Sequence, residues 1–170
     1  NQKEPKKRVV TCMSEEWQSI VMELGFGYFK SEKADKLWGT CVWNMFDFAI
    51  DSRNEGGIPG RNDKGLVTYD RKIKKDAFYL YKSYWSGESV LYITSRRFKK
   101  REKKHVAVKI YSNEEEITLY VNGVRIGQKC ASKTRQQHIF IFKGVKLRRG
   151  ENEIKAVSDS GLKDTVFWKY

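Results

Sequence analysis

The sequence predicts an α/β segment over residues 1–88, followed over residues 89–170 by an all-β domain, an antiparallel β-sandwich of immunoglobulin size. Two observations lead to this fold class. The first part holds two stretches with helical periodicity on either side of one apolar run, whereas the second part holds short β-rich runs separated by turn signals. We therefore expect two domains that meet near Gly87.

The first helix is expected over residues 14–29. Ser14 precedes the periodic residues as a natural N-cap, and Glu15 and Glu16 lie in the first turn, where negative charge is favourable. Apolar side chains then recur at the spacing of one helical face. They are Trp17, Ile20, Val21 and Leu24.

The central run, residues 37–48, reads LWGTCVWNMFDF and contains one charge. Its Thr, Val, Trp and Phe content favours a strand buried on both faces, with Cys41 as an inert thiol. The polar residues 49–68, with four glycines and one proline, are expected to form a long loop. A second amphipathic helix follows over residues 71–85, with Asp70 as its N-cap.

The β-rich runs of the second part are short, and several alternate between apolar and polar residues. Asn122-Gly123 is a strong signal for a tight hairpin between two of them. No Cys–Trp–Cys arrangement is present, so we expect an immunoglobulin-like sandwich without its disulfide. The runs are VLYITS, HVAVKIYS, EITLYVNG, QHIFIFKG, NEIKAVS and DTVFWKY.

The net charge of +13 is concentrated in residues 89–170, which hold 19 Lys and Arg against 8 Asp and Glu. The densest stretch, SRRFKKREKK at residues 95–104, fits a phosphate-binding patch or a solvated loop. The loop is favoured because only Phe98 interrupts the charges. The same charge motivates an alternative function, a non-catalytic module that binds carbohydrate or another polyanion. No nucleic-acid partner is expected, since no recognised motif accompanies the charge.

The cysteines are Cys12, Cys41 and Cys130, which lie far apart and form no C-x-x-C pair. We expect no metal site, no disulfide framework and no cofactor. No apolar run reaches the roughly 20 residues needed to cross a bilayer, and no signal-peptide core follows the lysine-rich start. We therefore expect neither a membrane span nor a targeting segment.

Residues 38–86 contain three unusual sequence motifs, VWNMFDF, NDKGLVTYDR and KKDAFYLYK. They closely resemble the end of the catalytic barrel of glycoside hydrolase family 2, above all its bacterial β-galactosidases. The similarity extends back through SEEWQ and forward through VKIYSNEEEITLYVNGVRIG, which looks like the β-sandwich after that barrel. The resemblance implies that residues 1–88 are the last helix–strand–helix segment of a TIM barrel, with residues 37–48 as its eighth strand.

Enzymes of this family are retaining glycosidases that use two glutamates. The resemblance implies that both lie upstream of this chain, so no catalytic residue and no activity are expected from the 170 residues alone. Glu15 and Glu16 are not expected to act as the pair. The segment SEEWQ matches a helix of the family, and adjacent helical residues point in different directions.

The resemblance implies three substrate-binding residues. Trp43 matches a family tryptophan near the sugar pocket, and its alternative is a place in the barrel core. Asn62 and Lys64 match an Asn-x-Lys pair that contacts the sugar carboxylate in family 2 β-glucuronidases, and their alternative is a role in a turn. The main expectation is a β-galactosidase, with β-glucuronidase specificity through Asn62 and Lys64 as the alternative.

The expected partners are a β-galactoside or related glycan and the rest of the catalytic barrel. A single barrel strand with two helices exposes apolar faces, so assembly as a homo-oligomer is a second way to cover them. We expect instead that the chain is a piece of a longer polypeptide. The compartment stays open between the bacterial cytoplasm and the periplasm or exterior.

Overall fold

The computed structural model describes residues 14–55 and 58–170, so the lysine-rich start and Cys12 lie outside the described residues. The chain divides into two compact units, Asn1–Phe78 and Tyr79–Tyr170. The described residues form mostly antiparallel β-sheets together with two α-helices. The domain boundary near Gly87 stays a prediction.

Helix α1 (Glu15–Phe29) begins where the sequence predicts. The backbone N–H of Trp17 donates to Ser14 Oγ at 3.2 Å, which confirms the N-cap. A short 3-10 helix, η1 (Glu32–Ala34), follows. The apolar face of α1 is exposed by more than a third at every position, so the described residues do not cover it. Its residues are Trp17, Ile20, Val21 and Leu24.

The prediction of a buried strand over residues 37–48 is wrong. The chain has no regular structure here until β1 (Phe48–Glu55) begins, and Trp38 and Cys41 are exposed rather than buried. A strand that is apolar on both faces needs a sheet to join and other elements that cover both faces of that sheet. Among the described residues, the part of this run that precedes β1 pairs with another segment at one position, an isolated β-bridge at Phe46.

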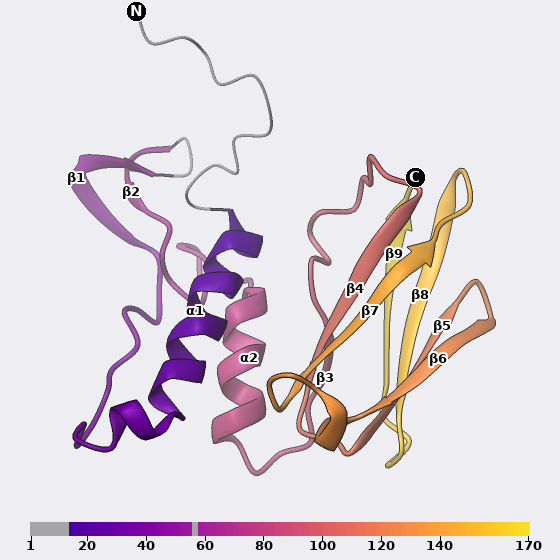
Figure 1. Cartoon of the computed structure of the whole chain (residues 1–170). Coiled ribbons are helices and arrows are strands. Elements are labelled where there is room, and N and C mark those ends of the chain that lie inside the picture. Colours follow the sequence, from indigo (N-terminus) through magenta and orange to yellow (C-terminus); the bar gives the residue numbers. More distant parts are fainter. Residues whose placement is uncertain (1–13, 56–57) are drawn as a thin grey trace, which may run out of the picture. The chain divides into compact units, whose positions relative to one another are not determined.

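The prediction of a loop over residues 49–68 is also wrong in part. Strands β1 and β2 (Ile58–Asn62) pair there as an antiparallel hairpin (Figure 1). The register shifts between Ala49 and Asn54, as at a β-bulge. The polar composition and the irregular register together remove the period-two pattern by which a strand is recognised in a sequence.

Helix α2 (Asp76–Trp85) begins later than predicted, and Asp70 does not cap it. The Asp70 carboxylate accepts hydrogen bonds from Thr68 Oγ1 at 2.6 Å and from the Lys72 backbone N–H at 3.2 Å. The bond from Thr68 is the main cause that holds the pKa of Asp70 below its ordinary value. Arg71 has a φ of 65°, which lies in the left-handed region and is incompatible with a right-handed helix. Residues 68–72 therefore form a turn ahead of the helix.

Residues 79–170 form two antiparallel sheets, which confirms the prediction of antiparallel β-structure (Figure 1). One sheet has the order β3-β4-β7 and the other β6-β5-β8-β9. Each predicted run contains a strand, but β6 was missed because its side chains are mostly exposed and do not alternate. The strands are β3 (Leu91–Ile93), β4 (His105–Ser112), β5 (Glu116–Val121), β6 (Val124–Cys130), β7 (Ile139–Lys146), β8 (Glu151–Ser158) and β9 (Lys163–Lys169), with η2 (Ala131–Lys133) before β7.

The two sheets share one apolar core. Side chains of β8 alternate strictly between buried and partly exposed positions, as expected for a strand with one face inward. Trp168 on β9 is the largest fully buried side chain, and the guanidinium of Arg101 lies 3.6 Å from the centroid of its ring. Arg101 and Arg96, which pairs with Asp164 at 2.5 Å, both belong to the basic stretch, so part of that stretch has a structural role.

No helix of residues 14–55 and 58–170 is long and apolar enough to cross a membrane.

Candidate functional site

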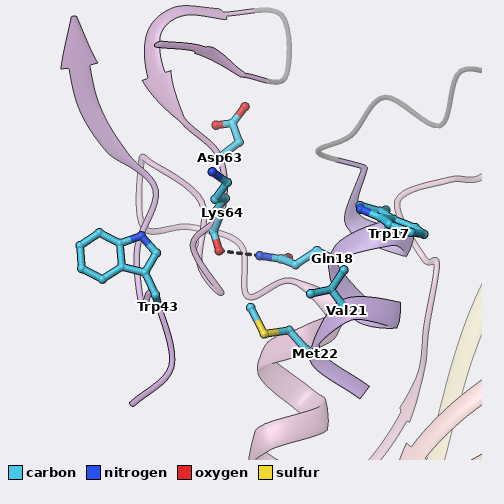
Figure 2. Close-up of a pocket in the computed structure, with 7 residues that line it drawn as sticks. All are labelled: Trp17, Gln18, Val21, Met22, Trp43, Asp63 and Lys64. Carbon is cyan, nitrogen blue, oxygen red and sulfur yellow. Dashed lines mark hydrogen bonds between the residues drawn. The ribbon is translucent and has the colours of Figure 1, made fainter. Parts of the chain in front are cut away.

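A hollow of about 400 Å³ lies in the unit Asn1–Phe78 (Figure 2). Residues of α1 form one wall, and the chain segments before β1 and after β2 form the other. Most of the lining is apolar, with one amide and two charged side chains, and the volume suits a small organic ligand. This hollow, the α1 pocket, is lined by Trp17, Gln18, Val21, Met22, Trp43, Asp63 and Lys64.

Gln18 joins the two walls of the α1 pocket. Its Nε2 donates to the carbonyl oxygens of Lys64 at 2.7 Å and Gly65 at 2.9 Å, and Figure 2 shows the amide extending from α1 to the Lys64 backbone. The Oε1 atom of the same amide is buried and has no hydrogen-bond partner among the described residues. Buried acceptors are nearly always paired, so Oε1 is a candidate acceptor for a ligand hydroxyl.

A buried ion pair fixes the loop that carries Lys64. The Asp47 carboxylate accepts from Lys75 Nζ at 2.7 Å and from the Gly65 backbone N–H at 2.8 Å. Lys75 Nζ also donates to the carbonyl oxygen of Asp63 at 2.8 Å. The side chains of Lys75 and Asp47 are only 6% and 3% exposed, so each charge depends on the other for compensation.

Gly65 is required where this loop crosses the segment of Asp47. A Cβ atom on Gly65 would lie 2.1 Å from the backbone nitrogen of Asp47 and 2.2 Å from the carbonyl carbon of Phe46. Both are backbone atoms and cannot rotate away. The close approach of the two segments therefore explains the glycine.

The structure brings together two of the three predicted substrate-binding residues. Trp43 and Lys64 both line the α1 pocket, and the Trp43 ring packs edge-on against Phe48 with centroids 6.0 Å apart. Asn62 does not line it: its side chain is buried, and its Oδ1 accepts from the Lys64 backbone N–H at 3.0 Å. Asn62 thus shapes the turn before Lys64. A substrate-binding role stays a prediction for all three.

The carboxylates near the α1 pocket have structural partners. Asp63 pairs with Arg61 at 2.5 Å, and this hydrogen bond is the main cause that raises the pKa of Arg61. Glu15 Oε1 accepts from the backbone N–H of Asp76 at 2.7 Å, at the start of α2, where a negative charge is favourable. Within residues 14–55 and 58–170, no three His, Cys, Asp or Glu side chains gather closely enough to hold a metal ion.

Similarity to known proteins covers nearly the whole chain. Residues 103–163 match the family model described as "Domain of unknown function (DUF4982)". A β-glucuronidase of Bacteroides fragilis is 43% identical over 123 residues, which are 72% of this chain and 17% of that protein. The crystal structure of the FMN-binding β-glucuronidase of Faecalibacterium prausnitzii L2-6 has a TM-score of 0.83 and 40% identity, and the match covers 94% of this chain and 23% of that one.

The chain matches a part of glycoside hydrolase family 2 proteins. It corresponds to the C-terminal portion, with the DUF4982 domain, of β-glucuronidase-like and β-galactosidase-like members. This confirms the resemblance that the sequence motifs suggested. A Bacteroides fragilis member with a provisional β-galactosidase name is also similar, with a TM-score of 0.82 and 37% identity over 92% of this chain and 23% of that one.

The names of these family 2 relatives bear on the expected specificity. The relatives described are mostly called β-glucuronidases, which favours the alternative over the main expectation of a β-galactosidase. The chain spans about a fifth of the length of these relatives, between 17% and 23%.

Proposed function

We propose that this chain supplies the sugar-binding side of a retaining family 2 β-glucuronidase, whose two catalytic glutamates lie elsewhere in the same polypeptide. One observation carries the proposal. Trp43 and Lys64 match sugar-site residues of the family, and they line a single pocket in a chain that is 40% to 43% identical to β-glucuronidases. A β-galactosidase is the second candidate, because one similar protein carries that name provisionally.

In this proposal, residues 1–88 complete a (β/α)₈ barrel and residues 89–170 form the immunoglobulin-like sandwich that follows it. The exposed apolar surface of residues 14–46 supports this assignment. Trp17 and Leu24, on one face of α1, and Trp38 are all exposed by more than two fifths, and large exposed apolar side chains on one helix face indicate an interaction surface. The earlier strands and helices of the barrel would cover that surface.

Three side chains of the α1 pocket, together with the neighbouring Asn62, would have distinct parts in sugar binding. The Trp43 indole would pack against the apolar C–H face of the ring. The Lys64 ammonium would donate a charge-assisted hydrogen bond to the glucuronide carboxylate, a contact that galactose cannot return. Gln18 Oε1 would accept from a sugar hydroxyl, and Asn62 would hold Lys64 in position through its backbone N–H.

Removing the Lys64 ammonium tests the proposed specificity. In the polypeptide that contains this chain, Lys64→Met should lower kcat/KM for an aryl β-glucuronide about 10- to 150-fold, since hydrogen bonds to charged groups contribute about 1.5–3 kcal/mol. The value for the matching aryl β-galactoside, which has no carboxylate, should change less than about twofold. The two kcat/KM values are measured side by side on the same preparation.

Lys33→Met provides the control, because Lys33 is an exposed residue of η1 that does not line the α1 pocket. It should leave both kcat/KM values unchanged. Equal losses on both substrates in Lys64→Met would indicate a structural role for Lys64. Unchanged values on both would rule out the proposed carboxylate contact.

A further inference from the structure

A second hollow, of about 740 Å³, lies within the unit Tyr79–Tyr170, apart from the residues of the α1 pocket. Its walls come from the segment before β4, the β5–β6 hairpin, the β7–β8 turn and the residue after β9. The volume is in the range of sites for small organic ligands. This hollow, the basic groove, is lined by Lys104, Val121, Asn122, Val124, Ile126, Lys146, Leu147, Arg148, Arg149 and Tyr170.

The charge of the basic groove has one sign. Lys104, Lys146, Arg148 and Arg149 line it, and no Asp or Glu does. None of the four forms an ion pair with a carboxylate of the described residues. A concave surface with several uncompensated cations concentrates the positive potential and attracts anions. The groove is therefore suited to a ligand with several negative groups.

Part of the lining of the basic groove is apolar. Val121 and Leu147 are buried, whereas Val124 on β6 is 64% exposed and Ile126 lies beside it. Tyr170 is the single aromatic residue of the lining. Nucleic-acid sites combine cations with several aromatic faces for base stacking, so this lining does not favour a nucleic acid. The apolar and the cationic side chains of the lining together match a ligand with carbon-rich faces and charged substituents.

The backbone around the basic groove is held in place by a fully buried amide. Asn152 accepts from the backbone N–H of Arg148 at 2.9 Å and donates to the carbonyl oxygens of Arg148 at 2.9 Å and Gly150 at 3.1 Å. Gly150 and Tyr170 exchange two backbone hydrogen bonds of 2.8 and 3.0 Å. Because the turn that carries the arginines is already ordered, ligand binding loses less conformational entropy there.

We propose that the basic groove binds an acidic glycan. Its carboxylate or sulfate groups lie against the four cations, and the C–H faces of its sugar rings lie on Val124, Ile126 and Tyr170. The basic groove shares no lining residue with the α1 pocket, and its proposed binding does not depend on any glycosidase activity. It locates polyanion binding on ten lining residues rather than on the charge of the whole domain.

The test compares two variants of the full chain that lose the same charge. Arg148→Ser/Arg149→Ser removes cations of the groove. Lys133→Ser/Arg135→Ser removes two exposed cations next to the start of β7, at the opposite end of that strand from Lys146. Binding of a heparin-derived hexasaccharide and of a galacturonic acid hexamer is measured by titration calorimetry at low and moderate salt.

The groove variant should weaken glycan binding about tenfold or more and flatten its salt dependence, while the control variant should change the Kd less than about twofold. Tyr170→Ala should weaken binding a few-fold and leave the salt dependence as it is. Circular dichroism checks the fold of each variant.

Three results would overturn the proposal. They are no binding of either glycan to the unmodified chain, equal losses in both charge variants, or tighter binding of a single-stranded oligonucleotide of matching charge that the groove variant abolishes.

Discussion

Replacing Lys75 with methionine should destabilise the unit Asn1–Phe78 by about 3–5 kcal/mol, because it leaves the Asp47 carboxylate buried without a compensating charge. The loss of stability has a second source, since Lys75 Nζ also donates a hydrogen bond to the carbonyl oxygen of Asp63. The loop that carries Lys64 should open as a result. Amide hydrogen exchange by mass spectrometry, in peptides that contain Leu66 and Val67, measures this opening.

The amides of Leu66 and Val67 are good reporters because they donate to the carbonyl oxygens of Asn44 and Met45 at 2.9 Å. Their exchange should accelerate on the order of a hundredfold or more in Lys75→Met. Lys72→Met, at an exposed lysine of the same segment, should leave the rates near their original values. Similar exchange in the two variants would show that the buried pair does not hold the loop.

Replacing Trp168 with alanine should destabilise the unit Tyr79–Tyr170 by about 3–5 kcal/mol, the cost of removing a large buried aromatic side chain and leaving a cavity. Trp168 is 1% exposed, and its ring also supports the Arg101 guanidinium, so both packing and a cation–π contact are lost. Urea denaturation followed by far-UV circular dichroism gives the change in midpoint.

Phe167 offers a matched control on the same strand. Its side chain is 50% exposed and points to the opposite face of β9 from Trp168. Phe167→Ala should cost about 1 kcal/mol or less, since little buried surface is removed. Equal costs for the two variants would contradict the assignment of the core to the Trp168 face.

Local patterns in the sequence were sufficient for much of the fold. Ser14 and the acidic first turn predicted the start of α1, and the alternation in β8 predicted its inward face. Each of these signals is contained within a few consecutive residues. The run at residues 37–48 failed for a different reason. Its apolar side chains suit a strand only where other strands and helices cover it, and the described residues do not supply them.

The candidate site was predictable only in part. Trp43 and Lys64 were identified through their match to family motifs, and they line one pocket. Gln18 was missed because its hydrogen bonds reach residues 46 and 47 positions away, which no local pattern encodes. Asn62 was expected to bind the sugar or to shape a turn. Its buried side chain accepts from the Lys64 backbone, a short-range turn contact that is common for asparagine, and a part in sugar binding stays a prediction.

In the proposed function, this chain helps to bind the sugar while another part of the polypeptide carries the nucleophile. A 2-deoxy-2-fluoro-β-glucuronyl fluoride, which traps the glycosyl-enzyme of a retaining enzyme, is used to label the nucleophile in the polypeptide that contains this chain. Peptide mass spectrometry then locates the label. We expect one labelled glutamate outside these 170 residues. A label on Glu15, Glu16 or any other carboxylate of this chain would contradict the claim.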